Sequence, residues 1–216
     1  MLKKYIPAAW HYPLSKIKRS LLGYKTYAQF GEDVLLSKLF ADTSRLPAQA
    51  GGMYVDVGAH HPKRYSNTYL LYKKGWHGVN IDPNPHTIEL FAKARPQDQN
   101  ICCGVGQAGV LTYYRFSDPA VNTFVTAEAE KWKQKKFLTF LGTTKVEVKP
   151  LSALVSGPID LLTIDAEGMD IEVLQSYDWK EYPKVVVVEG QAAVDFLLQK
   201  GYTMHAHLGA SYIFTR

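Results

Sequence analysis

Two acidic residues in the first half of the chain occur in patterns that favour binding of a nucleoside. Asp56 belongs to a short apolar run, residues 53–57, which is followed at once by Gly58 and Ala59. This pattern predicts a buried strand that leads into a tight turn, where a ligand can approach the backbone closely. A second apolar run, residues 78–82, ends in Asp82. Because a carboxylate at the tip of the second strand can accept hydrogen bonds from both ribose hydroxyls, we expect a nucleoside there.

The turn after Asp56 distinguishes between nucleoside cofactors. The dinucleotide fingerprint has three glycines, which allow a pyrophosphate to sit on a helix N-terminus. In this chain the turn reads GAHHPK, and Gly58 is its only glycine. Asp56 would repel a pyrophosphate but would attract a cationic amino-acid tail. S-adenosylmethionine has such a tail, so we expect this cofactor rather than NAD.

Alternating strands and helices must position these residues. Apolar periodicity predicts helices at 34–40, 66–74, 85–95, 126–137, 170–176 and 192–200. It predicts strands at 53–57, 78–82, 100–103, 110–116, 145–149, 159–165, 185–188, 202–207 and 211–215. The alternation indicates an α/β fold with a doubly wound, mainly parallel sheet and an antiparallel C-terminal hairpin. We expect one domain over 27–216, with an insertion at about 107–150 that shapes the acceptor pocket.

Bulk composition is typical of a soluble globular protein. The chain has 216 residues, of which 46% are hydrophobic and 21% are charged, enough for one domain with a substantial core. No apolar run approaches the ~20 residues that span a bilayer, and no signal peptide is visible. The two cysteines, Cys102 and Cys103, are adjacent, which disfavours a disulfide and fits a reducing compartment. We therefore expect a cytoplasmic protein.

The positive charge is concentrated in an N-terminal arm, residues 1–26. The whole chain has a net charge of +5, and residues 1–25 contain six Lys and Arg residues and no acid. Aromatic and aliphatic residues lie between these basic residues. The arm is therefore either a peripheral contact with the inner face of a membrane, a lid over the active site, or a solvated tail.

Several sequence blocks together resemble the FkbM-type S-adenosylmethionine-dependent methyltransferases. The blocks are YAQFGED at 27–33, YVDVGAHHP at 54–62, YSNT at 65–68, GWHGVNID at 75–82 and LTIDAEGMD at 162–170. Each block alone is a weak signal, but their order over most of residues 27–190 is specific. The resemblance implies a Rossmann-like class I methyltransferase fold. It also implies O-methylation of a hydroxyl on a sugar, a glycan or a polyketide-type small molecule.

The same resemblance implies a set of cofactor-binding residues. The methionine part would be held by the turn after the first strand and by the segment beyond it. The residues of this group are Asp56, Gly58, Ala59, Ser66 and Asn67. Asp82 would bind the ribose, and the adenine would be bordered by Cys103, Gly104 and Val105. The arm and the insertion match the family least, so we expect them to encode the identity of the acceptor.

Three later acids are candidates for the chemical step. Asp165, Glu167 and Glu189 lie at or just after predicted strands, and the topology brings them to the cofactor edge of the sheet. Methyl transfer needs a nearly collinear arrangement, and an alcohol acceptor needs activation. We predict that Asp165, with Glu189, forms either a general-base site or a Mg²⁺ site. The alternative is that Asp165 only orders its loop, caps a helix or touches the cofactor, while the two glutamates support packing.

A histidine pair in the first turn supplies another candidate base. His60 and His61 are adjacent, so in an extended chain their side chains face different ways, and one can reach the acceptor. We take His61 as the candidate. The alternative is a loop histidine with a structural hydrogen bond.

Two rival functions use other features of the chain. Amino-methylating nucleic-acid enzymes usually have Asn or Asp before Pro-Pro-aromatic after the fourth strand, whereas residues 165–168 read DAEG. A carboxylate cluster is also a poor surface for a phosphate backbone, so we expect no nucleic acid. The rival hypothesis from another class is a non-catalytic, membrane-associated partner in glycan assembly that would use its basic arm.

Overall fold

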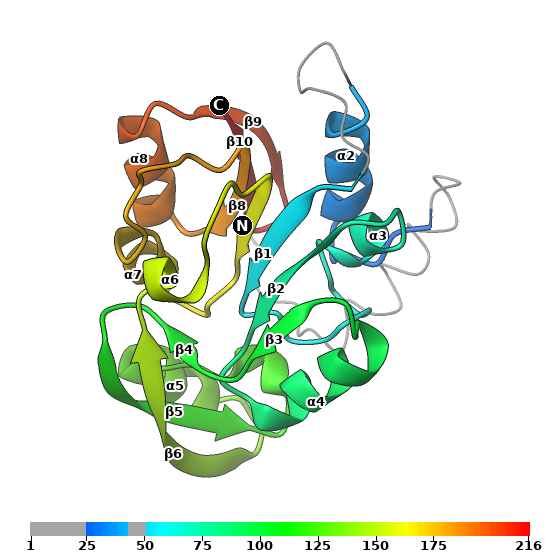
Figure 1. The fold of residues 1–216 in the computed structure, drawn as a ribbon. Helices are drawn as coiled ribbons and strands as arrows, with labels where there is room; N and C mark the ends of the chain where they lie inside the picture. The colour runs from blue at the N-terminus through cyan, green and yellow to red at the C-terminus, as the bar shows by residue number, and fades with distance from the viewer. Residues whose placement is uncertain (1–24, 43–50) are drawn as a thin grey trace.

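The computed structural model describes residues 25–42 and 51–216, and its centre is a seven-stranded sheet (Figure 1). The strand order is β3-β2-β1-β7-β8-β10-β9. The bounds are β1 (Met53–Val57), β2 (His77–Ile81), β3 (Gln99–Ile101), β7 (Leu161–Ile164), β8 (Val185–Glu189), β9 (Thr203–Leu208) and β10 (Ser211–Thr215). The first five strands in this order run parallel, and β10 is antiparallel to both of its neighbours. The predicted fold class, including the C-terminal hairpin, is confirmed.

The register of the central strands brings the acidic residues to one edge. Val57 at the end of β1 pairs with Ile81 of β2 on one side and with Ile164 of β7 on the other. The residues that follow these three positions, Gly58, Asp82 and Asp165, therefore leave the sheet side by side. This is the carboxyl edge of the parallel strands, where open α/β sheets bind ligands.

Helices cover both faces of this sheet. The bounds are α2 (Glu32–Leu39), α3 (Tyr69–Tyr72), α4 (Pro85–Ala94), α5 (Thr126–Lys133), α6 (Leu151–Leu154), α7 (Asp170–Gln175) and α8 (Gln191–Gln199). Side chains along β1 alternate between the two faces of the sheet. Val55 and Val57 pack in the core beneath α7 and α8, whereas Tyr54 packs in the core beneath α2 and α3. The strands are thus buried on both faces, as expected for a doubly wound parallel sheet.

The predicted insertion forms a second, smaller sheet. The strands β4 (Gly104–Val105), β5 (Gly109–Phe116) and β6 (Phe140–Lys149) pair in the order β4-β6-β5. A short 3-10 helix, η1 (Pro119–Val121), and α5 connect β5 to β6. Figure 1 shows this unit below the central sheet. It has its own small core of Phe116, Val121 and Ala129.

Several boundaries differ from the prediction. The helix predicted at 66–74 is the single turn α3, because the Ser66 hydroxyl accepts hydrogen bonds from the backbone N–H groups of Thr68 (3.3 Å) and Tyr69 (3.1 Å). The strand predicted at 145–149 begins at Phe140, since β6 pairs along the whole of β5. The strand predicted at 100–103 ends at Ile101 as β3, and β4, which begins at Gly104, belongs to the other sheet. The helix α6 and η1 were not predicted.

Residues 1–24 and 43–50 lie outside the described residues, so the role of the N-terminal arm stays a prediction. Within the part of the chain that the structure describes, no helix has the length and apolar character needed to cross a bilayer.

The predicted start of α4 is confirmed: the Asn84 side chain accepts a hydrogen bond from the His86 N–H (3.1 Å), and Pro85 begins the helix.

Candidate active site

A cavity of about 350 Å³ opens at the carboxyl edge of the parallel strands. Its size is in the range of small-molecule sites. Twelve of the thirteen predicted site residues line it. They are Asp56, Gly58, Ala59, Ser66, Asn67, Asp82, Cys103, Gly104, Val105, Asp165, Glu167 and Glu189. Residues far apart in sequence meet here because their strands are parallel and end together.

The turns after β1 and β7 contact each other without intervening side chains. Gly58 has a φ of 74°, and a Cβ atom on it would stand 1.9 Å from the carbonyl oxygen of Asp165. The Gly58 N–H donates to the carbonyl of Ile81 (3.0 Å), and the Asp165 N–H donates to the carbonyl of Val57 (3.0 Å). Glycine is therefore required at position 58 both by conformation and by space.

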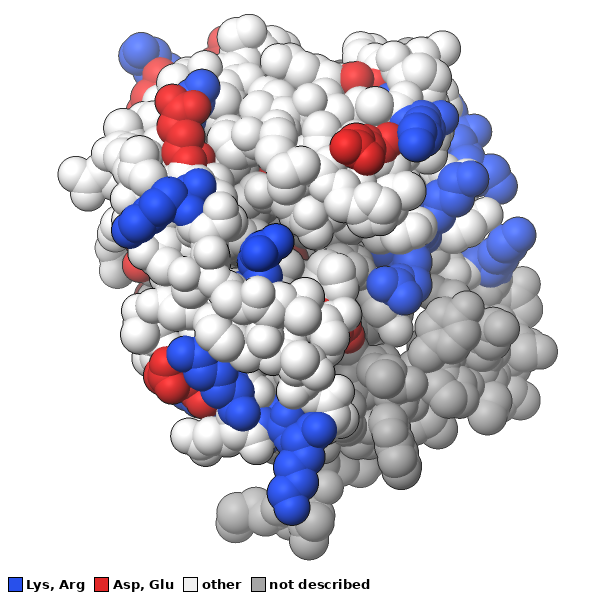
Figure 2. All heavy atoms as spheres, turned by 90° about the horizontal axis from the view of Figure 1, so that it is seen from below, with Lys and Arg blue, Asp and Glu red and all other residues white. Residues whose placement is uncertain are grey.

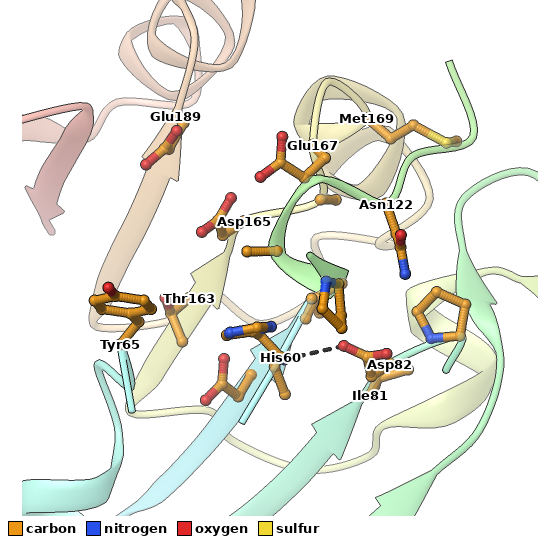
Figure 3. A pocket seen from close by; sticks show the side chains of 18 of the residues that line it. His60, Tyr65, Ile81, Asp82, Asn122, Thr163, Asp165, Glu167, Met169 and Glu189 are labelled. Atoms are coloured by element: carbon orange, nitrogen blue, oxygen red, sulfur yellow. Dashed lines mark hydrogen bonds between the residues drawn. The ribbon is translucent and has the colours of Figure 1, made fainter. Parts of the chain in front are cut away.

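Asp82 is held rigidly at the tip of β2. One carboxylate oxygen accepts a hydrogen bond from the His60 N–H (2.9 Å), drawn in Figure 3, and the other accepts from the Asn84 N–H (2.8 Å). Each oxygen keeps a lone pair for a ligand, as a ribose diol requires. Burial raises the pKa of Asp82 to about 6, although the two backbone hydrogen bonds oppose that rise.

Three acids stand on another side of the cavity. Figure 3 shows the side chains of Asp165, Glu167 and Glu189 directed toward the same space, with His60 between them and Asp82. Desolvation, followed by the charge of Asp56, raises the pKa of Asp165 to about 6. Desolvation, followed by the charge of Asp165, raises the pKa of Glu189 to about 9 and that of Glu167 well above its usual value. At neutral pH Asp165 is therefore ionised, whereas Glu189 is protonated.

Asp170 fixes the spacing of these acids, and the sequence analysis missed this role. It is buried in the first turn of α7. Its carboxylate accepts hydrogen bonds from the N–H groups of Glu189 (2.9 Å) and Ala166 (3.2 Å). It thus joins the turn after β7 to the end of β8. Its place at the end of the LTIDAEGMD block is the signal that could have identified it.

The histidine that faces the cavity is His60, not the predicted His61. The Nδ1 atom of His61 accepts hydrogen bonds from the N–H groups of Lys63 and Arg64, both at 3.0 Å, so its ring orders the loop. The alternative of a structural loop histidine describes this geometry, and a catalytic role for His61 finds no support in it. His60 lines the cavity, and burial, followed by the charge of Arg64, lowers its pKa to about 4. His60 is therefore neutral at physiological pH.

Backbone strain is concentrated around the cavity. Four non-glycine residues among those described have a positive φ, and three of them, His60 (52°), Tyr65 (57°) and Glu167 (47°), line this space. Such conformations cost about 1–3 kcal/mol each and cluster at functional sites. The strain is independent support for this cavity as the functional site.

Other walls come from segments for which no site residue was predicted. Tyr113, Asn122, Phe124 and Trp132 of the insertion line the cavity, as do Gln29 and Phe30 of the YAQFGED block. The hydroxyl of Thr123 donates to the carbonyl of Glu167 (2.9 Å) and ties the insertion to the acidic turn. These contacts place the insertion beside the site, where it can contact a ligand.

The cavity and the outer surface differ in charge. Among the described residues, five acidic residues and neither Lys nor Arg line the cavity. By contrast, Figure 2 shows Lys and Arg spread more widely than Asp and Glu over the face seen from below. The interior therefore favours cationic and neutral polar ligands over phosphates.

The predicted Mg²⁺ site finds no support in the side-chain arrangement. Asp165 and Glu189 were its candidate ligands. Residues 25–42 and 51–216 contain no group of three or more His, Cys, Asp and Glu side chains placed to hold a metal ion.

One protein-family profile matches most of the chain. The profile of the methyltransferase FkbM domain matches residues 56–207, well over half of the chain. A comparison with curated proteins gave no match.

Solved structures are similar in fold at low sequence identity. Methyltransferase FkbM from Methylobacillus flagellatus KT superimposes with a TM-score of 0.52 and 12% identity, over 83% of this chain and 47% of that chain. The present chain thus spans about half the length of that relative. A TehB-like SAM-dependent methyltransferase from Corynebacterium glutamicum has a TM-score of 0.43 and 14% identity, over 95% and 96% of the two chains. An O-methyltransferase from Bacillus cereus, in complex with SAH, has a TM-score of 0.41 and 9% identity, over 98% and 93%.

Proposed function

The chain belongs to the FkbM methyltransferase family, and we propose that it transfers a methyl group from S-adenosylmethionine to a hydroxyl of a sugar, a glycan or a polyketide-type small molecule. One observation carries this proposal. A single cavity has the rigid carboxylate of Asp82, with free lone pairs, on one side and the carboxylate of Asp165, beside two acids whose pKa values are raised, on another.

The residues present fit this methyl donor. Asp82 would accept hydrogen bonds from the ribose hydroxyls. Ile81, Val105 and Phe124 supply an apolar surface for a purine ring. Asp56 would attract the ammonium of the amino-acid tail. The bound cofactor would supply a methyl group on a positively charged sulfur, and the acidic lining of the cavity would attract that charge.

Asp165 is the residue that we assign as general base. Its pKa of about 6 lies close to the pH of the reaction, so it is ionised yet still basic enough to take a hydroxyl proton. Glu189, with a pKa of about 9, is protonated and can donate a hydrogen bond to the acceptor. Asp170 holds the two chain segments at a constant separation. The chain's main contribution is thus orientation plus removal of one proton.

The lining of the cavity supports a small neutral acceptor. Tyr65, Phe30 and Gln29 offer stacking surfaces and an amide near the acids, a combination that suits a polar hydroxylated molecule. A nucleic-acid strand would bring its phosphates against the carboxylates, which is unfavourable.

Calorimetric titration of the purified protein with S-adenosylmethionine, S-adenosylhomocysteine and NAD tests the first part. We expect binding of the first two alone, weakened at least tenfold in Asp82→Ala because two ribose hydrogen bonds to a charged group are lost. If a folded sample binds none of the three, the proposal is wrong, and the non-catalytic partner in glycan assembly becomes the better hypothesis. Liposome binding through the N-terminal arm would then be measured.

The second part is tested by acceptor screening. Methyl transfer to panels of sugar and polyketide hydroxyls would be measured with and without EDTA. Activity that persists in EDTA supports the general base, whereas activity that needs added Mg²⁺ would contradict it.

A further inference from the structure

A fully buried arginine organises the loop that forms one wall of the cavity. Arg95 follows α4 directly and has 0% of its surface exposed. The rings of Tyr69, Tyr72 and Phe91 surround its guanidinium, with centroids 5.3, 5.5 and 4.9 Å from Cζ. The aromatic faces and the fork of hydrogen-bond donors both constrain the orientation of this guanidinium.

The shortest side-chain hydrogen bonds of Arg95 all go to the segment between β1 and α3. Its Nε and Nη2 atoms donate to the carbonyl of Pro62 at 3.0 and 2.5 Å. Nη2 also donates to the hydroxyl of Ser66, and Nη1 donates to the hydroxyl of Thr68, both at 2.8 Å. This segment carries His60, Tyr65, Ser66 and Asn67 into the cavity. Arg95 does not line the cavity itself, so it acts through these residues.

The bond to Thr68 continues to the carboxylate of Asp56. The Thr68 hydroxyl lies 2.7 Å from Oδ2 of Asp56, and Thr68 is fully buried. Arginine can only donate, so the Thr68 oxygen accepts from Arg95 and its single hydrogen is left to donate to Asp56. The direction of this relay is thus determined. Burial raises the pKa of Asp56, and the Thr68 hydrogen bond and the Arg95 charge partly oppose that rise.

The opposite side of Arg95 provides an internal comparison. Asp98 lies 4.0 Å from Nη1 and accepts hydrogen bonds from the Tyr54 hydroxyl (2.5 Å) and the Gly78 N–H (3.0 Å). The Tyr54 hydroxyl also accepts a longer bond from Nη1 (3.3 Å). Tyr54 and Asp98 are buried but do not line the cavity. The same network therefore has a branch toward the site, through Thr68, and a branch away from it, through Tyr54.

We propose that Arg95 and Thr68 are positioning residues for the amino-acid end of the cofactor, because they hold the carboxylate of Asp56 in the orientation that receives its ammonium group. The inference rests on the proposed function. It distinguishes the two ends of the cofactor: the adenosine end depends on Asp82, and the amino-acid end depends on the relay from Arg95 to Asp56.

Two ligands allow the contributions of these two ends to binding to be measured separately in solution. S-adenosylhomocysteine contains both, whereas 5′-methylthioadenosine has the adenosine part without the amino-acid tail. We expect Thr68→Val, which keeps the shape of the side chain but removes the relay, to weaken S-adenosylhomocysteine about tenfold and to leave 5′-methylthioadenosine unchanged. Thr68→Ser keeps a hydroxyl and is expected to bind both as the wild type does. Tyr54→Phe, the control in the other branch, is also expected to bind both normally.

Calorimetric titration of the full chain gives these affinities, and a thermal melt shows that each variant is folded. Arg95→Lys serves as a second probe should Thr68→Val fail to fold, since a lysine cannot reproduce the fork, and its expected signature is the same selective loss. Equal losses for both ligands, or no loss in a folded Thr68→Val sample, would overturn the inference. A wild type that binds neither ligand overturns the proposed function and this inference with it.

Discussion

The backbone of Gly58 lies against the carbonyl oxygen of Asp165, with 1.9 Å between that oxygen and the position of a Cβ atom on residue 58. Two turns that carry the cofactor-binding and the catalytic candidates are thereby in direct contact. Any side chain at position 58 must push these turns apart. The spacing between the two halves of the site therefore depends on this one glycine.

We expect Gly58→Ala to destabilise the protein by more than ~3 kcal/mol and to abolish cofactor binding, because it combines a left-handed φ with a backbone clash. Gly157→Ala is the matched control. Gly157 has a φ of 80°, close to the 74° of Gly58, but a Cβ atom there would meet nothing within 4 Å. Gly157→Ala should lower the free energy of unfolding by only about 1 kcal/mol. Chemical denaturation of both variants measures the difference, and equal costs would contradict the clash.

Substitution of Asp165 should separate activity from stability. Asp165→Asn removes the proposed base and is expected to lower turnover 10²–10⁴-fold. It also removes a charge that is unfavourable in its surroundings, so the melting temperature should stay equal or rise. Glu189→Gln is the comparison: its pKa of about 9 means that the native side chain is already protonated, and glutamine resembles that state. Its loss of turnover should be much smaller, and an equal loss would transfer the role of base to Glu189.

Asp170→Asn should loosen the acidic side of the cavity. An amide at this position can accept only one of the two backbone hydrogen bonds, from Glu189 or from Ala166, and leaves the other N–H without its partner. We expect a loss of about 1–3 kcal/mol in unfolding free energy and reduced turnover. Glu172→Gln, an exposed position in the same helix turn, should change neither. Denaturation curves and methyl-transfer rates of the two variants test this.

The stability of the unliganded protein should increase as the pH falls from 8 to 5. The pKa values of Asp82 (about 6), Asp165 (about 6) and Asp170 (about 7) are raised by burial. A carboxyl with a raised pKa binds its proton more tightly when folded, so its contribution to stability appears as the pH falls through the folded pKa. That contribution is complete below the unfolded value of about 4.

His60 opposes this trend, because its pKa is lowered to about 4 and its protonation favours the unfolded chain below pH 6.5. Since several carboxyls act against one histidine, we expect a net rise of several degrees in melting temperature, measured by calorimetry across this pH range. The slope of the melting temperature against pH should become smaller in Asp165→Asn. A melting temperature that falls over the same interval would show that these carboxyls are not desolvated.

The predicted strands and the acids that follow them are a local property of the chain. A short, β-branched apolar run such as 185–188 favours a buried strand, and the carboxyl ends of neighbouring parallel strands lie at one edge of the sheet. The sequence therefore predicted that Asp56, Asp82 and Asp165 share one edge of the sheet. The start of a helix was predicted correctly where a capping residue was present, as at Asn84. The prediction was wrong where a hydroxyl accepts the backbone hydrogen bonds in place of the helix, as at Ser66.

The sequence by itself thus determined the order of strands and helices, the family and the acidic edge of the sheet, since these follow from periodicity and from short motifs. Only the tertiary structure decided which of two adjacent histidines faces the cavity, since that depends on the φ of His60. It also decided which acids are ionised, because pKa values depend on burial and on neighbouring charges. The roles of Arg95 and Asp170 lay beyond sequence reasoning because each joins segments that meet only in the folded chain.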